Sequence, residues 1–471
     1  MYRINPEYCF RLHQVRPRFK NDIENVLLYV SSKISKLEPS SSNIFNKQLF
    51  DAIRLFPGNA TKSDKTISNW RTEISALFGL VIESVSNNIC APGEIAKKLS
   101  DNEDLVEFFK YFLFYFQYPG GHIKTHKLKA VIDNGIRFKP VKYILKVLEA
   151  GEKITGSRFH IDKAEATHFI YNDLRVTRDN CEPIEVVERI IHNRQNFVEL
   201  DWQGDVIRYA GDILDYMVIG DLLTKHGTNY YVNWNIRETI TSFLNSQIWF
   251  DGYDEFYDQD FEANELAEKE TDWFLFINND LNNELFKTDV LGYLGIEGDD
   301  YAPLIKNAIS DLESKAGDSS AFKNTKEIGD FGEHLILGHE SMRIKLAGKD
   351  DLIHLIKKIP TYLAVGYDIQ SVEVDSQKRY IEVKTTISNQ PINFNHFHLT
   401  TNEWNVAQTL ENHYYVYRLM INKTKNKLFL IKNPVSKYKK DLLKTTLRKE
   451  GVDIIFNQKS GEYEELLIWK S

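Results

Sequence analysis

Apolar positions follow two different periods along this chain of 471 residues. In the first part they recur every three or four positions, which predicts amphipathic helices over residues 21–56. The first such stripe consists of Ile23, Val26, Leu27, Val30 and Ile34. In Tyr380 to Lys384, by contrast, apolar and charged residues alternate, which predicts a β-strand. The pattern therefore predicts a multidomain α+β protein, mostly helical at the N-terminus and with a sheet in its C-terminal core.

A polar turn after residue 57 leads into another predicted helix, whose exposed face is rich in polar side chains. These are Lys65, Ser68, Asn69, Arg71 and Thr72. Such side chains reach phosphates and the edges of bases. Two helices, a turn and a third helix fit a winged-helix or helix-turn-helix module that contacts DNA. An amphipathic helix with an ordinary polar face is the alternative.

Two further basic segments are candidate DNA contacts. The first follows the break at residues 119–121 and carries Lys124, Lys127, Lys129 and Lys142. A solvated helix surface would have the same composition. The second runs from Lys437 to Lys449 and is predicted to be a basic helix, in which Lys439 and Lys440 would hold a nucleic-acid backbone.

Three other segments add to the expected helical architecture. The aromatic residues of the predicted helix over residues 94–118 indicate core packing, with a base-stacking platform as the alternative. Asp162 followed by Glu165 matches a capping box and predicts a helix start. Leu222 to Asn233 has the order of helix, glycine turn and aromatic strand, which would continue a winged-helix pattern.

The net charge of −8 is distributed unevenly. Residues 251–300 contain 16 of the 67 acidic side chains and 2 of the 59 basic ones, so the rest of the chain is mildly basic and compatible with DNA binding. We predict an acidic spacer over residues 251–320. The alternative readings of its carboxylates are a surface that repels DNA until a complex forms and a second metal site. Gly298 to Pro303 would form a boundary and Lys315 to Ser320 a linker.

Several classes of protein are disfavoured by what the chain lacks. It has no apolar run of membrane-spanning length and no signal-peptide pattern. Its three distant cysteines argue against a disulfide framework and a zinc cluster. It has no GxxxxGK[ST] segment for binding nucleotide phosphates. A cytoplasmic protein without membrane association is expected.

The candidate chemistry lies in the last third of the chain. Glu382 and Lys384 fall on one face of the predicted strand, and Asp368 lies in the preceding segment with strand character. If a short turn joins the two strands, these three side chains meet near one edge of a sheet. Clustered carboxylates suit a hard divalent cation such as Mg²⁺. A lysine beside such a cation would hold a water molecule or a phosphate.

These residues resemble a known family. The spacing from Asp368 to Glu382 and Lys384 resembles the PD-(D/E)XK nuclease pattern, with Tyr367 at the proline position. Together with GE at 332–333, GYDI at 366–369, IEVKTT at 381–386, NEW at 402–404 and YYVYR at 414–418, it is similar to the C-terminal domain of the protein NO VEIN, which also occurs in bacterial defence proteins.

The resemblance implies a restriction-endonuclease-like core with a mixed sheet flanked by helices. It also implies that Asp368 and Glu382 hold Mg²⁺ and that Glu333 holds it directly or through a water molecule. The Val383 carbonyl would be a further ligand, and Mn²⁺ a substitute. Lys384 would orient the attacking water. Asp368, Glu382, Lys384 and Glu333 are thus the candidate catalytic residues, and Glu403 is expected to be structural or to support them.

The sequence thus predicts two winged-helix-like recognition regions (1–120 and 121–250), the spacer, and a nuclease domain over 321–471. The expected function is Mg²⁺-dependent cleavage of double-stranded DNA by a restriction enzyme, type II-like or modification-dependent, acting as a homodimer with a possible companion methyltransferase. One alternative is a subunit of a multiprotein phage-defence system that is inactive without its partners. A non-catalytic binding module and an RNA substrate are further alternatives.

Overall fold

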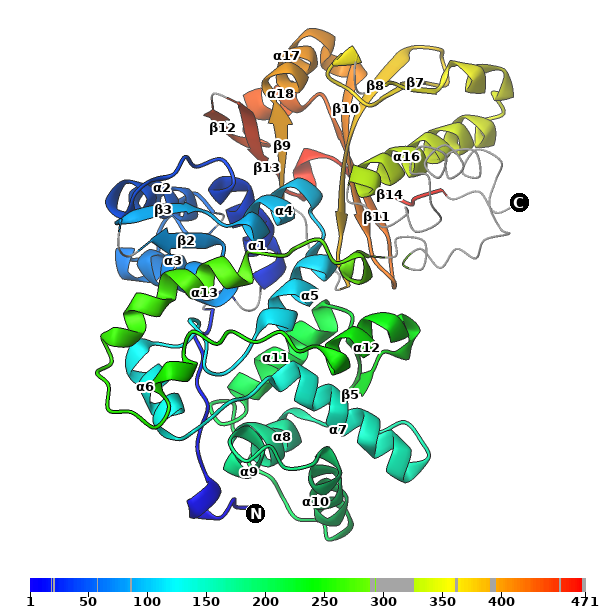
Figure 1. Cartoon of the computed structure of the whole chain (residues 1–471). Helices are drawn as coiled ribbons and strands as arrows, with labels where there is room; N and C mark the ends of the chain where they lie inside the picture. Colours follow the sequence, from blue (N-terminus) through cyan, green and yellow to red (C-terminus); the bar gives the residue numbers. More distant parts are fainter. Residues whose placement is uncertain are drawn as a thin grey trace. The chain divides into compact units, whose positions relative to one another are not determined.

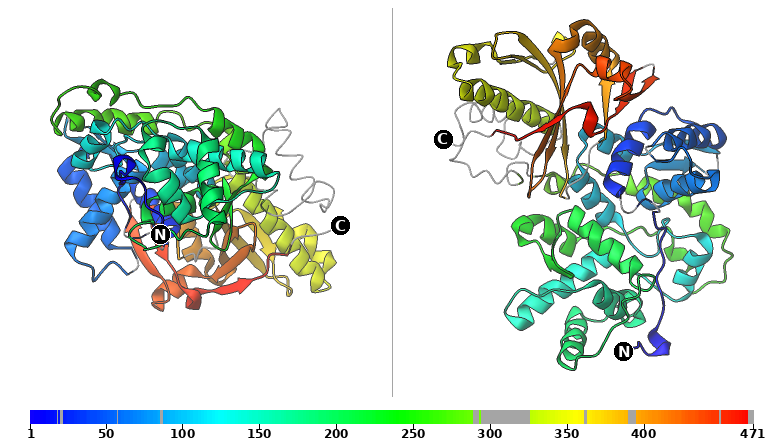
Figure 2. Two further views of the ribbon diagram at one scale, coloured as in Figure 1. Left: turned by 90° about the horizontal axis from the view of Figure 1, so that it is seen from below. Right: turned by 180° about the vertical axis from the view of Figure 1, so that it is seen from behind.

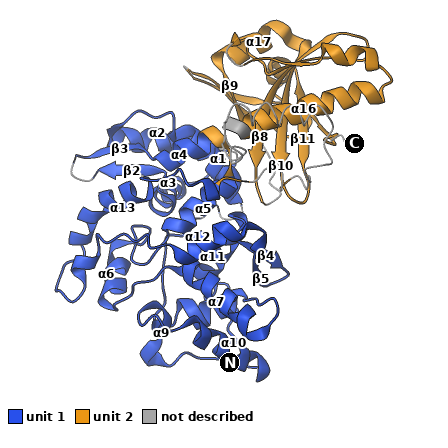
Figure 3. Cartoon of the chain, turned by 45° about the vertical axis from the view of Figure 1, so that its right-hand side comes forward, with its two compact units in different colours: residues 1–100, 105–286 blue, residues 101–104, 287–471 orange. Residues whose placement is uncertain are grey.

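A computed structural model of the protein (Figure 1, with further views in Figure 2) describes residues 1–17, 19, 22–56, 58–84, 87–288, 293, 326–360, 363–389, 395–448 and 450–467. Contacts divide the chain into two compact units (Figure 3): residues 1–100 with 105–286, and residues 101–104 with 287–471. The predicted boundary at 298–303 and linker at 315–320 lie outside the described residues. Within the described part, none of the helices has the length and apolar character needed to cross a membrane.

Unit 1 is mostly helical, as the hydrophobic periodicity predicts. Its α-helices are α1 (Ile23–Ile34), α2 (Ser42–Arg54), α3 (Asp64–Phe78), α4 (Glu94–Asn102), α5 (Leu105–Tyr115), α6 (Thr125–Asp133), α7 (Pro140–Thr155), α8 (Lys163–Ala166), α9 (Leu174–Thr177), α10 (Pro183–Gln195), α11 (Arg208–Ile219), α12 (Arg237–Asn245) and α13 (Glu270–Ile277). The predicted capping box is confirmed, because the Asp162 carboxylate accepts from the Glu165 N–H while the Glu165 side chain accepts from the Asp162 N–H at the start of α8.

The first three helices surround a small antiparallel sheet (Figure 1). Its strands β1 (Ser40–Ser41), β2 (Val81–Ser84) and β3 (Ile89–Pro92) are ordered β1-β3-β2. Along the chain the order is helix, strand, helix, helix, strand, strand. The Ser63 hydroxyl accepts a hydrogen bond at the start of α3, and Gly79 ends it with a left-handed φ of 64°.

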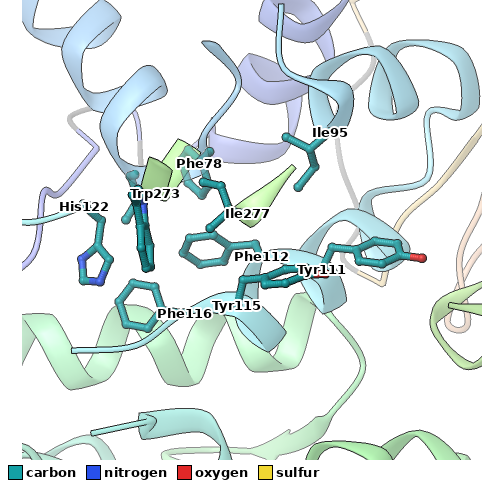
Figure 4. Close-up of a pocket in the computed structure, with 10 residues that line it drawn as sticks. Phe78, Ile95, Tyr111, Phe112, Tyr115, Phe116, His122, Trp273 and Ile277 are labelled. Carbon is teal, nitrogen blue, oxygen red and sulfur yellow. The ribbon is translucent and has the colours of Figure 1, made fainter. Parts of the chain in front are cut away.

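The aromatic helix predicted over 94–118 is two helices, α4 and α5, because Glu103 has a positive φ of 47° and breaks the first. Side chains of α5 and its C-terminal extension face Trp273 and Ile277 of α13 (Figure 4). The pocket between them has a volume of only about 10 Å³, room for about one water molecule. Core packing is therefore the role of these rings, and they leave no platform for bases.

Two predictions for unit 1 are wrong. In residues 222–233 the predicted glycine turn and aromatic strand are confirmed, but the predicted helix is wrong. Leu223–His226 is strand β4, which forms a hairpin with β5 (Asn229–Val232) across Gly227 at a φ of 61°. The β-branched and aromatic residues of this segment suit a pleated surface better than a helix. Residues 251–286 are no spacer: they belong to unit 1 and bury Trp273, Phe274 and Phe286 in its core, because their apolar residues outweigh the solvation of the carboxylates around them.

Unit 2 is built on a mixed sheet, as predicted. Its strands are β6 (Lys357–Lys358), β7 (Ile369–Val372), β8 (Lys378–Ile387), β10 (Tyr414–Ile421), β11 (Lys427–Lys432) and β14 (Glu462–Glu464), in the order β14-β11-β10-β8-β7-β6. Only β8 and β10 pair in parallel among the described strands, and the other neighbours are antiparallel. A second sheet orders β12 (Lys444–Arg448), β13 (Gly451–Ile455) and β9 (His396–Thr400) as β12-β13-β9.

The long helix α16 (Lys326–Leu346) packs against β6, β7 and β8 (Figures 1 and 2). Close packing depends on Gly332, where a Cβ atom would overlap the Thr385 side chain of β8. About two turns further along α16, the buried Glu340 carboxylate accepts hydrogen bonds from the hydroxyls of Ser371 at 2.6 Å and Tyr417 at 2.8 Å. These contacts tie the helix to the sheet.

The predicted basic helix over 437–449 is wrong. Helix α18 (Pro434–Lys439) ends early, and Asp441 follows with a φ of 56°. Residues 444–448 then form strand β12 and pair with β13. The run Thr445-Thr446-Leu447 favours a strand because threonine is β-branched, and this preference outweighs the basic composition.

Candidate functional site

Strands β7 and β8 bring Asp368 and Glu382 to one edge of the large sheet. Asp368 directly precedes β7, and its N–H donates to the Ile381 carbonyl at 2.9 Å. The Val383 N–H in turn donates to Oδ2 of Asp368 at 2.8 Å. The hairpin that the sequence predicts between the two strands is confirmed, since β7 and β8 pair in antiparallel register.

Lys384 is held between two carboxylates. Its Nζ lies 2.6 Å from Oε1 of Glu382 and 3.3 Å from Oε2 of Glu403. Glu403 belongs to the first turn of α17 (Thr401–Leu410) and also forms the capping box of that helix with Thr400. Glu403 therefore does two things: it fixes the start of α17 and orients the lysine ammonium.

Glu333 approaches the same carboxylates from helix α16. Its Oε2 lies 2.9 Å from Nζ of Lys358 on β6, and that nitrogen also lies 3.1 Å from Oδ1 of Asp330. The charge of Asp368 acts on Glu333 as well. The four residues predicted to be catalytic, Glu333, Asp368, Glu382 and Lys384, are thus gathered at one place.

The carboxylates of this cluster repel one another. Burial and the nearby charge of Asp368 raise the pKa of Glu333 to about 7. Burial raises the pKa of Asp368, and burial with the charges of Asp368 and Glu403 raises that of Glu382 well above its ordinary value. Burial also opposes ionisation of Glu403, but Lys384 and the Thr400 N–H hold the pKa of Glu403 below its ordinary value. If all of its carboxyl groups were ionised, the cluster would carry more negative charge than its two lysines neutralise.

Such an excess of carboxylates fits a divalent cation, and the pair Asp368 and Glu382 could hold one. No group of three or more carboxylate, imidazole or thiol side chains in the described part of the chain has the spacing to hold a metal ion. The pair Asp368 and Glu382 nonetheless matches the needs of Mg²⁺, which takes one or two carboxylates and keeps several waters. In a strand the N–H and carbonyl of one residue point to the same side. The Val383 carbonyl therefore faces the side where its N–H meets Asp368.

The polar residues predicted on the first recognition helix lie on α3. Lys65 is exposed, and Ser68, Asn69 and Arg71 are half-buried. Buried Ile67, Trp70 and Ile74 anchor the opposite face. The predicted amphipathic helix is confirmed, and whether its polar face contacts DNA stays a prediction.

The other predicted DNA contacts are more scattered. Lys124 and Lys127 are exposed at the start of α6. Lys129 pairs with Asp133 at 2.9 Å, and the Lys142 ammonium donates to the Ser246 carbonyl at 2.6 Å, so both lysines already bind groups of their own unit. Lys439 and Lys440 are exposed at the end of α18.

Sequence reasoning missed two site residues, Lys358 and Asp330. Lys358 lies on a two-residue strand, too short for any periodicity to reveal. Asp330 precedes Glu333 by three residues, which places both on one face of a helix, so a helical projection of residues 326–346 was a signal that could have found it.

Comparisons with known proteins cover both units. A family model described as "Restriction endonuclease BpuJI - N terminal" matches residues 2–274, and one described as "Protein NO VEIN, C-terminal" matches residues 332–431. The second match confirms the resemblance drawn from the motifs, and its range contains Glu333, Lys358, Asp368, Glu382, Lys384 and Glu403. A search of curated proteins found no match.

A solved structure supports the first match. The chain is similar to the protein in "Crystal structure of pyrene- and phenanthrene-modified DNA in complex with the BpuJ1 endonuclease binding domain", with 26% sequence identity and a TM-score of 0.52. The similarity covers 59% of this chain and 100% of that one. Because the first family model also spans more than half of the sequence, the chain belongs to the family described as restriction endonuclease BpuJI, N-terminal.

Proposed function

We propose that the chain is a Mg²⁺-dependent DNA endonuclease of the restriction kind, in which unit 1 binds DNA and unit 2 cleaves it. One observation carries the proposal: Asp368, Glu382 and Lys384 meet at the edge of a mixed sheet, with Glu333 reaching them from α16. This is the arrangement that the PD-(D/E)XK pattern requires. The two matched family models, of the N-terminal part of a restriction endonuclease and of the C-terminal part of the protein NO VEIN, support the same reading.

DNA binding by unit 1 rests on α3 and on the similar structure. The order of α1, β1, α2, α3, β2 and β3 is that of a winged-helix module, in which the second helix of the helix-turn-helix enters the major groove. Helix α3 takes that place. The similar binding domain is in complex with pyrene- and phenanthrene-modified DNA. Lys65 and Arg71 would then contact phosphates or base edges, and double-stranded DNA is favoured over RNA.

Asp368, Glu382 and the Val383 carbonyl would hold Mg²⁺, and Mn²⁺ would substitute. When bound, the cation would polarise the scissile phosphate and lower the pKa of a coordinated water. Lys384, fixed by Glu382 and Glu403, would orient the attacking water and stabilise the negative charge that develops on the phosphate. Glu333 would act on the cation through a water molecule, since Lys358 already binds one of its oxygens.

Cleavage of both strands with one such site per chain would require two copies, so the active form would be a homodimer acting on foreign DNA in the cytoplasm. The decisive experiment uses the purified full chain with Mg²⁺ on plasmid and on methylated and unmethylated phage DNA. Asp368→Asn and Lys384→Ala run beside it, and each is expected to abolish cleavage while leaving DNA binding intact.

Discrete fragments lost in both variants would support a self-sufficient restriction enzyme. Binding without cleavage by the unsubstituted chain would instead support a defence-system subunit that needs a partner, for which the lack of a nucleotide-binding GxxxxGK[ST] segment leaves room. Cleavage that survives both substitutions would mean that the active site lies elsewhere.

A further inference from the structure

A second lysine, Lys358, contacts the candidate metal site from the strand at the edge of the sheet. Its ammonium bridges two acids of α16, with Nζ 2.9 Å from Oε2 of Glu333 and 3.1 Å from Oδ1 of Asp330. Only 23% of its side chain is exposed, and 14% of that of Glu333. Two acceptors at these distances make this a fixed contact, because each of them takes one of the three ammonium donors.

The backbone holds Lys358 beside Asp368. Strand β6 pairs with β7, so that Lys358 lies opposite Ile369, the residue after Asp368. The next residue, Ile359, donates its N–H to the Asp368 carbonyl at 2.7 Å. The charge of Lys358 also acts on the Asp368 carboxylate, where it opposes the effect of burial on the pKa. Lys358 is therefore part of the carboxylate cluster, although it lies outside the Glu-X-Lys pattern.

The two lysines divide the carboxylates between them. Lys384 lies against Glu382 and Glu403, and Lys358 lies against Glu333 and Asp330. Asp368 is the member of the cluster whose carboxylate no lysine contacts within 4 Å in the described residues. A cation bound by Asp368 and Glu382 would not compete with Lys358 for a carboxylate. A second divalent cation that used Asp368 and Glu333 would have to lie beside the Lys358 ammonium and compete with it for the same carboxylate.

We propose that Lys358 is a positioning residue that takes the place of a second cation at Glu333 and limits the site to one divalent ion per chain. The inference rests on the proposed function, because it assumes that Asp368 and Glu382 hold a cation. It assigns the direct contact of Glu333 to Lys358, leaving Glu333 to act on the metal only through water, and it makes the number of bound cations depend on a residue of the protein itself.

The test counts bound Mn²⁺ on the purified full chain by electron paramagnetic resonance of the free ion, without DNA. Only ions that are lost in Asp368→Asn are counted. The unsubstituted chain is expected to bind one such ion, and Lys358→Met two, because Glu333 and Asp330 are then released. Lys358→Arg, which keeps the charge, is expected to bind one.

Lys357→Met is the matched control. Lys357 is the preceding residue of β6, is exposed, and faces the other side of the strand. This variant is expected to bind one ion. Circular dichroism of each variant verifies folding. Lys358→Gln, a second uncharged variant, keeps the test decisive where Lys358→Met unfolds, since it too should bind two ions, whereas Lys358→Arg, which keeps the charge, should not.

The outcomes separate the two proposals. Two ions on the unsubstituted chain, or one ion on folded Lys358→Met, would overturn the role given to Lys358 and leave the nuclease proposal standing. No Asp368-dependent ion on the unsubstituted chain would overturn the nuclease site and the inference with it. One ion that becomes two only when Lys358 loses its charge supports both.

Discussion

The backbone N–H of Val383 donates a hydrogen bond to Oδ2 of Asp368 over 2.8 Å. Since Val383 lies between Glu382 and Lys384, this bond holds the Asp368 carboxylate beside both of them. It keeps buried carboxylates close together although they repel, and a bound cation would relieve that repulsion.

The stability of unit 2 should fall as pH rises from about 4.5 to 7. The pKa of Glu333 is raised from 4.5 to about 7, first by burial and then by the charge of Asp368. Within this window the folded chain therefore binds more protons than the unfolded chain, so the free energy of unfolding decreases with pH, by about 3 kcal/mol from this group. Urea denaturation at a series of pH values, without divalent cations, measures it.

Glu333→Gln should make this part of the pH profile less steep, because the amide does not titrate while Asp368 and Glu382 still do. Added Mg²⁺ should flatten it too, since a nearby cation favours the ionised carboxylates. A variant with the same slope as the unsubstituted chain would show that Glu333 is not the group responsible.

Gly332→Ala should destabilise unit 2 and reduce cleavage. The added Cβ would overlap the Thr385 side chain, so α16 must move off β8 and carry the adjacent Glu333 with it. We expect a loss of about 1–3 kcal/mol in the free energy of unfolding. Gly338→Ala on the same helix is the control: its Cβ would meet nothing within 4 Å, so it should stabilise the helix by roughly 0.5–1 kcal/mol. Equal effects at the two positions would contradict the packing argument.

Arg379→Met should destabilise unit 2 without changing a residue of the candidate active site. The buried guanidinium lies 2.7 Å from Glu373 and 3.3 Å from the fully buried Glu340, and it also contacts the Tyr417 hydroxyl. Its loss removes one of the two guanidinium groups that neutralise these acids, the other being that of Arg343, at a cost of about 3 kcal/mol. Lys378→Met, at the preceding and exposed position of β8, should cost less than about 1 kcal/mol. Chemical denaturation of both variants measures the two losses in the free energy of unfolding.

Arg71→Ala and Lys65→Ala should weaken DNA binding by unit 1. If both side chains contact phosphates, each loss should lower affinity for all sequences and reduce the slope of log K against log salt by roughly 1. Fluorescence anisotropy at several salt concentrations measures this slope. Lys153→Ala, an exposed lysine on α7 that pairs with Glu149, should leave the slope unchanged. If both α3 variants bind DNA with the affinity of the unsubstituted chain, the DNA contact does not lie on this helix.

Much of the architecture follows from local patterns of apolar and polar residues along the sequence. The apolar stripe of Ile23 to Ile34 specifies a helix, and the alternation around Glu382 specifies a strand, because helix and strand periods differ. The pattern from Asp368 to Lys384 also located the candidate site, since a short hairpin leaves two neighbouring strands little choice of register. The same local reasoning failed at 437–449 and 222–226, where basic or apolar composition masked a strand preference.

Only the tertiary structure decided which distant residues complete the site and which segments join the core. Lys358 reaches the cluster from a two-residue strand, and its separation from the motif along the chain leaves no trace in any period. Likewise, the acidic segment over 251–286 packs into unit 1 because Trp273 and Phe286 find partners on α5. The sequence determined the local elements and the central motif. The neighbours of that motif depend on long-range packing, which is set by the whole chain and not by the residues beside it.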